Sequence, residues 1–252
     1  MTFFRAESLS INFGGVQALE DVSFEVEPGQ VFTIIGPNGA GKTTVFNLVS
    51  RIYEPSHGRL VFCDEDITGV APHEIARRGI ARTFQNIELF EHATLLQNLL
   101  LARHAHKKSG FFSELFFLPS VRQMELEHRE AVEKAIDFLD LQQYRDSFIV
   151  NLPYGVRKVT ELARALCTDP KLLLLDEPSS GLNVEETEDM AFWIEDIKNQ
   201  LGITVLMVEH DMSLVSAVSD RVLALNYGRP IATGTPAEVQ AHPEVIRAYL
   251  GG

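Results

Sequence analysis

The stretch that decides the fold is residues 36–43, which read Gly36-Pro37-Asn38-Gly39-Ala40-Gly41-Lys42-Thr43. This stretch matches the pattern G-x-x-x-x-G-K-[S/T] at every fixed position. The mostly apolar residues 31–35 before it predict a buried strand, and apolar residues at helical spacing after it predict a helix. Glycines allow successive backbone N–H groups to point at an anion, and the helix N-terminus adds positive potential. The loop therefore predicts binding of a nucleoside triphosphate.

Each residue type in the loop has a predicted task. Lys42 supplies a mobile cation for the outer phosphates, and the Thr43 hydroxyl can ligate Mg²⁺. The nucleotide-binding residues predicted from this stretch are Gly36, Pro37, Asn38, Gly39, Ala40, Gly41, Lys42, Thr43 and Thr44.

The composition is that of an ordinary globular protein that can bury a core. The chain has 252 residues, 45% of them hydrophobic and 23% charged, which excludes a mainly disordered, collagenous or disulfide-stapled protein. The formal net charge of −13 is a poor balance for binding nucleic acid through its phosphates, so no nucleic-acid partner is expected.

The sequence has no apolar run that approaches about 18 residues, the length needed to cross a membrane, so no membrane-spanning helix is expected. No signal peptide is expected either. Cys63 and Cys167 are predicted to be buried free thiols.

Apolar runs and chain breakers alternate along most of the sequence. Further strands are predicted at residues 59–63, 80–84, 171–175, 203–208 and 221–225, with helical patterns between several of them. This succession predicts an α/β fold with a mostly parallel sheet. Short alternating runs at 8–13 and 22–26 predict an antiparallel β subdomain at the N-terminus.

The strand signal is lost between residues 86 and 151, where 94–106 and 121–141 have helical patterns. We therefore expect a single domain, residues 1–252, with an α/β core of residues 1–85 and 152–252 and an inserted helical subdomain of residues 86–151. Between the two helices, residues 111–118 are rich in phenylalanine. This segment either folds onto the core of the subdomain or presents a docking patch to a partner.

Two further apolar runs end in polar residues that suit chemistry on a triphosphate. Leu172–Leu175 precede Asp176 and Glu177, and the carboxyl end of this predicted strand should lie beside the phosphate loop. Asp176 would then hold Mg²⁺, and Glu177 would accept a proton from an attacking water. A solvated or helix-capping acid pair is the alternative, but Asn183 and Glu186 form a better capping box. At the end of the 203–208 run, His210 could hydrogen-bond the γ-phosphate.

Residues 151–158, Asn-Leu-Pro-Tyr-Gly-Val-Arg-Lys, complete a set of motifs that resembles the ATP-binding-cassette (ABC) ATPases. The phosphate loop, Gln85, this signature stretch, the Asp176-Glu177 strand and His210 occur in the order of that family and span essentially the whole chain. The resemblance implies a P-loop NTPase core that hydrolyses ATP with Mg²⁺.

The resemblance also implies roles for single residues. Phe13 resembles the aromatic that stacks on adenine, and Gln85 the residue that touches Mg²⁺ and the attacking water while sensing a transmembrane partner. Glu177 resembles the general base, and His210 the switch at the γ-phosphate. Tyr154 and Gly155 belong to the signature, which covers the nucleotide held by a second subunit.

Two departures from the family pattern stand out. The common signature is Leu-Ser-Gly-Gly-Gln, and here Pro153, Tyr154 and Val156 replace its serine, first glycine and glutamine. The expected consequence is a weakened, not abolished, dimer contact. Asn183 stands where the family usually has aspartate.

The implied partners are a second ATPase subunit, either a copy or a paralogue, in a head-to-tail dimer, transmembrane permeases and, indirectly, an extracytoplasmic solute-binding protein. The implied location is peripheral, on the cytoplasmic face of the inner or plasma membrane. The 79–86 stretch, the Tyr154-Gly155 signature, the Phe-rich insert and the ending at 245–251 resemble the uptake ATPases for branched-chain amino acids. Related importers for urea, amides or aromatic acids share many of these sequence features. An exporter of lipid or lipopolysaccharide type, a soluble non-transport ABC ATPase and a regulatory module without turnover are the alternatives.

Overall fold

The computed structural model describes residues 3–83, 85, 87–103 and 119–250. By its internal contacts the chain divides into two units, the first formed by residues 1–85 and 171–252 and the second by residues 86–170. The predicted insert ended at residue 151, whereas the second unit continues to Pro170. The reason is that the helix at Tyr154–Leu166 packs against the other helices of the second unit. The Phe-rich residues 111–118 lie outside the described residues.

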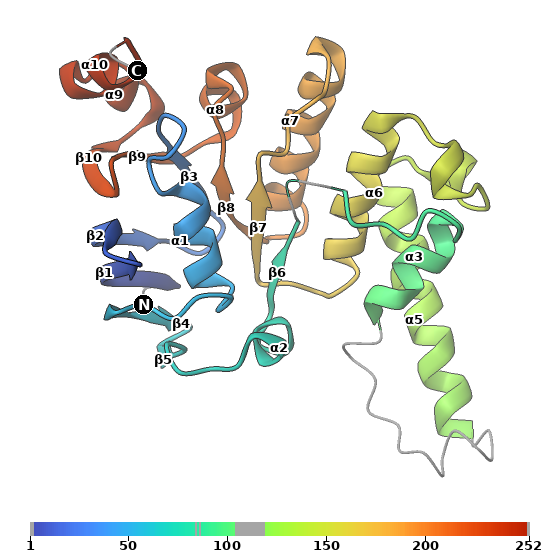
Figure 1. Cartoon of the computed structure of the whole chain (residues 1–252). Coiled ribbons are helices and arrows are strands. Elements are labelled where there is room, and N and C mark those ends of the chain that lie inside the picture. Colours follow the sequence, from blue (N-terminus) through green and yellow to red (C-terminus); the bar gives the residue numbers. More distant parts are fainter. Residues whose placement is uncertain (1–2, 84, 86, 104–118, 251–252) are drawn as a thin grey trace. The chain divides into compact units, whose positions relative to one another are not determined.

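The first unit contains two sheets (Figure 1). One has the order β2-β1-β4-β5 and is antiparallel, with bounds β1 Phe4–Phe13, β2 Val16–Val26, β4 His57–Phe62 and β5 Glu65–Asp66. The other has the order β10-β9-β3-β8-β7-β6, with bounds β10 Arg229–Gly234, β9 Arg221–Asn226, β3 Val31–Ile35, β8 Thr204–Val208, β7 Leu172–Asp176 and β6 Ile80–Arg82. Only β10 runs antiparallel to its neighbour in the six-stranded sheet. The predicted α/β class with an N-terminal antiparallel subdomain is confirmed.

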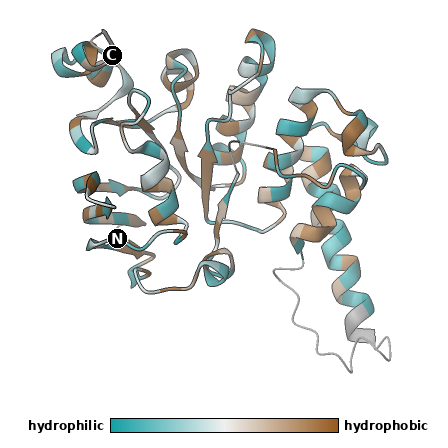
Figure 2. Cartoon of the chain, viewed as in Figure 1, coloured by the Kyte–Doolittle hydropathy of each residue, from teal (hydrophilic) through white to brown (hydrophobic). Residues whose placement is uncertain are grey.

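The central strands are buried along their whole length. Every residue of β3, β7 and β8 is buried, and Figure 2 shows the hydrophobic residues that run along them. A parallel strand covered on both faces favours apolar side chains along most of its length, because neither face meets water. This explains why the sequence has continuous apolar runs here instead of alternation.

Most helices of the first unit connect these strands, and the last two follow β10. Their bounds are α1 Lys42–Val49, α2 Pro72–Ile75, η1 Ala76–Arg78, α7 Val184–Asn199, α8 Met212–Val218, α9 Pro236–Gln240 and α10 Pro243–Leu250. The predicted capping box at α7 is confirmed, since Asn183 Oδ1 accepts from the N–H of Glu186 and Glu186 Oε2 accepts from the N–H of Asn183. Asn183 is therefore fixed as a cap, which leaves Asp176 and Glu177 outside that role.

The described part of the second unit is helical. Its elements are α3 Leu95–Ala102, α5 Pro119–Phe138, η3 Gln142–Tyr144, η4 Ile149–Asn151 and α6 Tyr154–Leu166. Glu161, on α6, is buried, and its Oε1 accepts a hydrogen bond of 2.9 Å from the backbone N–H of Glu88. This bond ties the first residues of the unit to the helix that carries the signature.

One cysteine prediction is wrong. Cys167 is buried and free, and burial raises the pKa of its thiol to about 12. Cys63 is also free but exposed, because β4 ends at Phe62 and Cys63 begins a turn with a left-handed φ of 50°. The pattern had placed it on the strand.

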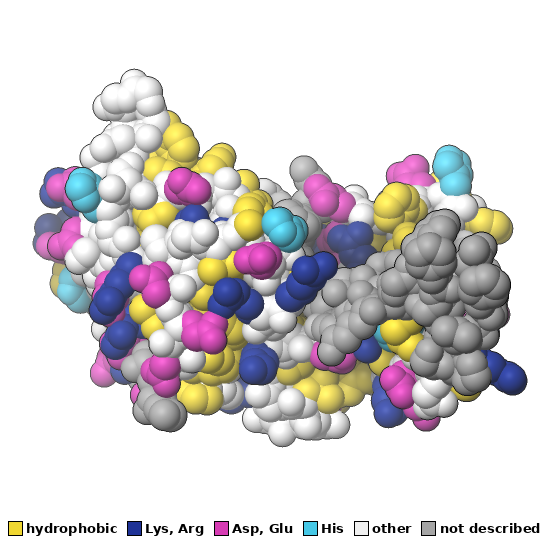
Figure 3. All heavy atoms as spheres, turned by 90° about the horizontal axis from the view of Figure 1, so that it is seen from below, with side chains coloured by type: hydrophobic (Ala, Val, Ile, Leu, Met, Phe, Trp, Pro, Cys, Tyr) yellow, Lys and Arg dark blue, Asp and Glu magenta, His cyan; other side chains and the backbone are white. Residues whose placement is uncertain are grey.

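Acidic and basic side chains are mixed on the face of the molecule that Figure 3 shows. Pairs such as Arg78 with Glu65 lie near the surface, where ion pairs contribute little to stability. None of the described helices is both long enough and apolar enough to cross a membrane.

Candidate nucleotide-binding site

Three parallel strands of the six-stranded sheet end at the same edge and bring the motifs together. Strand β3 pairs with β8, and β8 with β7, so that Ile34 lies opposite Val208 and Val208 opposite Asp176. Ligands of open α/β sheets bind at the carboxyl ends of their strands. Residues 36–41, 177 and 209–210, which follow directly, therefore share one site.

The conformation of the loop depends on its glycines. Gly36 has a φ of 152° and Gly41, the N-cap of α1, a φ of 100°. A Cβ on Gly36 would lie 2.3 Å from the Leu225 carbonyl oxygen, and one on Gly41 would lie 2.6 Å from a side-chain carbon of Leu19. Both positions thus require glycine twice over, once for the backbone angle and once for space.

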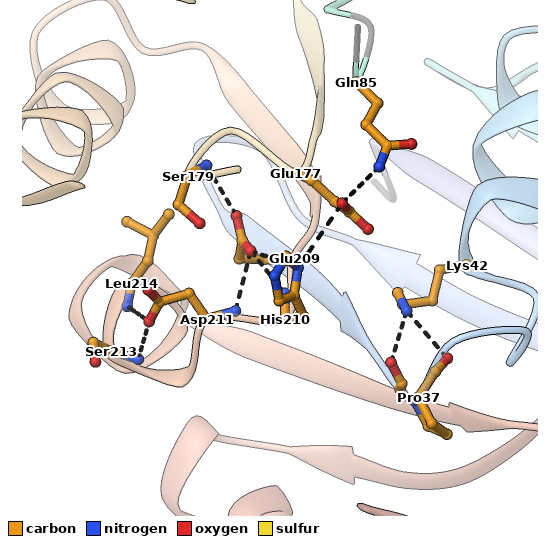
Figure 4. Close-up of polar contacts among 11 residues, drawn as sticks. Pro37, Lys42, Gln85, Glu177, Ser179, Glu209, His210, Asp211, Ser213 and Leu214 are labelled. Carbon is orange, nitrogen blue, oxygen red and sulfur yellow. Dashed lines mark hydrogen bonds and ion pairs between the residues drawn. The ribbon is translucent and has the colours of Figure 1, made fainter. Parts of the chain in front are cut away.

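Lys42 is held inside the loop by the carbonyls of the loop itself. Its ammonium donates to the carbonyl oxygen of Gly36 at 2.7 Å and to that of Pro37 at 3.2 Å (Figure 4). Burial lowers the pKa of Lys42, an effect that the nearby carboxylates of Glu177, Glu209 and Asp176 oppose. Both of these hydrogen-bond acceptors are neutral carbonyl oxygens, which phosphate oxygens can replace.

A pocket of about 500 Å³ opens over this loop. It is lined by residues 38–44, by residues 16–18 of β2 and by Gln85, Glu177 and Tyr227. The loop, the proposed general base and Gln85 therefore meet in one pocket, as the motifs predict.

Glu177 is placed in this pocket by a left-handed turn after β7. Its φ is 49°, and its N–H donates to the Val208 carbonyl at 2.9 Å. The carboxylate oxygen Oε2 accepts a hydrogen bond of 2.9 Å from Nε2 of Gln85. Nδ1 of His210 lies 3.9 Å from the same oxygen. Gln85 and His210, which are also predicted to be catalytic, thus both lie close to the Glu177 carboxylate (Figure 4).

Glu209 belongs to the site, and the sequence reasoning gave it no role. It is fully buried, with Oε1 accepting from the N–H groups of His210 at 2.8 Å and Asp211 at 3.1 Å, and Oε2 from that of Ser179 at 3.2 Å. Its carboxylate thereby joins the chain after β8 to the turn after Glu177. The signal that marked His210, a polar residue directly after an apolar strand, applies to Glu209 as well.

Asp176 occupies the last position of β7 and is buried. Its Oδ2 forms an ion pair of 2.7 Å with Nη2 of Arg82 on β6. Arg82 is the second residue near the site that the motifs did not identify.

Phe13 is not among the described residues that line the pocket. It lies at the end of β1, 43% exposed, with its ring edge against Tyr53 at a centroid distance of 5.0 Å. Its neighbour Val16 does line the pocket, as does Tyr227, an 85% exposed residue with a left-handed φ of 46°. An adenine-stacking role for Phe13 stays a prediction.

The signature residues lie in the second unit. Pro153 is the N-cap of α6, Tyr154 is its first residue and partly exposed, and Gly155 is buried in its first turn. Proline is tolerated at such a position because the first N–H groups of a helix have no partner within it. The contact of these signature residues with the nucleotide of a second chain stays a prediction.

Comparisons with known proteins cover the whole chain. A family model described as "ABC transporter" matches residues 19–180, and one described as "Branched-chain amino acid ATP-binding cassette transporter" matches residues 229–252. The chain is similar to the "High-affinity branched-chain amino acid transport ATP-binding protein BraF" of Pseudomonas aeruginosa, with 42% identity over 96% of this chain and 95% of that protein. It is 41% identical to the protein LivG of Escherichia coli K12, whose name also describes high-affinity branched-chain amino acid transport, over the same shares.

A solved structure has the same fold. The crystal structure of the ADP conformation of MJ1267, described as an ATP-binding cassette of an ABC transporter, superposes with a TM-score of 0.87. The two sequences are 32% identical, and the match covers 100% of both chains.

Proposed function

Because the chain belongs to the ABC transporter family and is an ATPase of that family, we propose that it energises a membrane importer for branched-chain amino acids. The observation that carries this proposal is the likeness, over 96% of the chain, to ATP-binding proteins named for that transport. The separate match at residues 229–252 lies outside the general ABC segment and supports the same substrate class. Import is thereby favoured over the exporter, non-transport and regulatory alternatives.

ATP binds with its phosphates against the N–H groups of residues 36–41 and the start of α1. Lys42 exchanges its two carbonyl contacts for phosphate oxygens. Glu177 accepts the proton of the attacking water while Gln85 and His210 hold the carboxylate and the γ-phosphate in place. Preorganised polar groups of this kind stabilise the charge that develops in the transition state.

The donor set at the site fits Mg²⁺. Thr43 and Gln85 line the pocket, and Asp176 is the last residue of β7, directly before Glu177 in the pocket lining. Among the described residues no three His, Cys, Asp or Glu side chains form a group that could hold a metal alone. Mg²⁺ is typically held by one or two carboxylates together with substrate phosphates, so a sparse set is the expected one. When bound, the ion neutralises charge on the phosphates.

Two ATPase subunits pair head to tail, and the N-terminus of α6, with Tyr154 and Gly155, covers the nucleotide of the partner. This helix has 13 residues, and its N-terminus favours an anion. Closure moves permeases docked against the subunit at the cytoplasmic face of the membrane. ATP drives this closure because it makes more contacts in the closed state than in the open one.

The test is transport by the assembled complex. The chain is co-expressed with its permeases and reconstituted in vesicles, and ATP hydrolysis is measured with binding protein loaded with leucine, isoleucine or valine. Hydrolysis should rise with these solutes and should not rise with urea, amides or sulfate. A complex stimulated only by the latter solutes would refute the assigned substrate class.

A further inference from the structure

Arg82 is a buried arginine that joins three elements beside the phosphate loop. Its Nη2 donates to Oδ2 of Asp176 at 2.7 Å, and its Nη1 donates to Oδ1 of Asn47 and Oγ of Ser50, both at 2.8 Å. Asn47 lies on α1 and Ser50 is the C-cap of that helix. The guanidinium carbon lies 5.5 Å from the centroid of the Phe46 ring, also on α1. Arg82 therefore connects the last residues of β6 and β7 to the helix that begins at Lys42.

The ion pair between Arg82 and Asp176 is nearly excluded from water, with side-chain exposures of 8% and 4%. A buried ion pair is weak evidence for stability, since desolvation offsets most of the attraction. The ion pair does fix the orientation of the Asp176 carboxylate. The guanidinium of Arg82 is planar and rigid, and its Nη1 is bound to Asn47 and the C-cap Ser50 of α1 while its Nη2 binds Asp176. The position of α1 thus determines, through Arg82, how the Asp176 carboxylate is oriented.

The acceptor in the bond from Nη2 of Arg82 is Oδ2 of Asp176. The next residue, Thr83, reinforces the arrangement, since its N–H donates to the Leu174 carbonyl at 2.9 Å. The ends of β6 and β7 are therefore held together, three residues before Gln85 in one case and one residue before Glu177 in the other.

We propose that Arg82 is the positioning residue of the Mg²⁺ site: it holds Asp176 by Oδ2 and so keeps the other carboxylate oxygen available to the hydrated ion. Before nucleotide arrives, Arg82 also supplies the positive charge that balances this buried carboxylate. The proposal rests on the proposed function, in which Asp176 contributes to the Mg²⁺ site.

The test compares ATP binding by the purified full chain with Mg²⁺ and with EDTA, by calorimetry. The dissociation constant of ATP in EDTA divided by that in Mg²⁺ measures how much Mg²⁺ improves binding. In Arg82→Met this ratio should fall by about tenfold, the order seen when a residue that orients a metal ligand is removed. Binding in EDTA should stay unchanged, because the loop and Lys42 are intact. Arg78→Met is the matched control, since Arg78 pairs with Glu65 near the surface, and it should keep the wild-type ratio.

Arg82→Lys retains the charge and lacks the fork, so it should also lower the ratio, to a smaller extent. It carries the test by itself if thermal melting shows that Arg82→Met does not fold. A wild-type ratio in either folded variant overturns the role of Arg82. A wild-type protein that binds ATP equally well with Mg²⁺ and with EDTA overturns the Mg²⁺ site itself, and with it the premise of this proposal.

Discussion

Nε2 of Gln85 donates a hydrogen bond of 2.9 Å to Oε2 of Glu177, across 92 positions of sequence. The bond joins Gln85, three residues beyond the end of β6, to Glu177, the residue that follows β7. It holds the carboxylate proposed as the general base from the side of Gln85, which the resemblance links to the transmembrane partner. A displacement of Gln85 would therefore reach the base directly.

Gly36 and Gly39 offer a paired test of the phosphate loop. Gly36→Ala would place a Cβ 2.3 Å from the Leu225 carbonyl oxygen, whereas nothing lies within 4 Å of a Cβ at Gly39. Gly36→Ala should lower the free energy of unfolding by about 3 kcal/mol or more, through overpacking added to backbone strain. Gly39→Ala carries only the strain of its φ of 80° and should cost about 1 kcal/mol. Urea unfolding measures both, and equal losses would refute the close contact at Gly36.

Glu209 is expected to support the site through three backbone bonds. Glu209→Ala leaves the N–H groups of Ser179, His210 and Asp211 without their acceptor. Buried donors left in this way cost about 1–3 kcal/mol each. The variant should therefore lose about 3 kcal/mol of stability and also turn over ATP more slowly. Urea unfolding and phosphate release check this. Exposed Glu185, changed to alanine, is the control, and a loss as small as that of the control would show that Glu209 is dispensable.

The pH dependence of ATP binding should report on Lys42. Burial lowers its pKa from the ordinary value of 10.5, and only the protonated form attracts phosphate. Affinity should therefore fall as pH rises through this lowered pKa, below the range in which an exposed lysine titrates. Calorimetric titrations with ATP in EDTA across alkaline pH measure the effect. Lys42→Met should bind ATP weakly at every pH. If the affinity of this variant falls with pH as steeply as that of the wild type, the pH dependence belongs to another group.

Glu161 should make stability depend on pH in the opposite sense to a carboxylate whose pKa is lowered on folding. Burial raises its pKa above the ordinary value of 4.5, so the folded chain holds this proton more tightly than the unfolded chain. The contribution is fully present below pH 4.5 and is lost as pH rises through the raised pKa. Glu161→Gln cannot titrate, so its advantage in stability over the wild type should grow across that window. Urea unfolding at several pH values checks this, and a difference that does not vary with pH would contradict it.

The sequence predicted the parallel strands well because buried strands carry continuous apolar runs. Strand β3 has the predicted bounds, β7 is shifted by one residue at each end, and β8 begins one residue later than predicted. The loop and Glu177 could be predicted because consecutive residues define them. Helix α3 ends at Ala102, and residues 104–106 of the predicted helix lie outside the described residues.

The contacts that give Arg82 and Glu209 their roles could not be read from local patterns, although Glu209 shares with His210 a position directly after an apolar strand. The partner of Arg82, Asp176, lies 94 positions away, and their contact depends on β6 lying beside β7. Glu209 matters because of the three backbone groups that converge on it, which only the fold brings together. The exposure of Cys63 was missed because a left-handed turn begins one residue earlier than the apolar run suggested.

The measurement that tests the central claim most directly is phosphate release by the purified transporter carrying Glu177→Gln, with Glu185→Gln as the control. The amide cannot accept the proton of water, so kcat should fall by about 10²–10⁴-fold. Its carbonyl oxygen can still accept from Gln85, so ATP binding should be retained. The control should turn over at the wild-type rate. A Glu177→Gln transporter that releases phosphate as fast as the control would show that Glu177 is not the base.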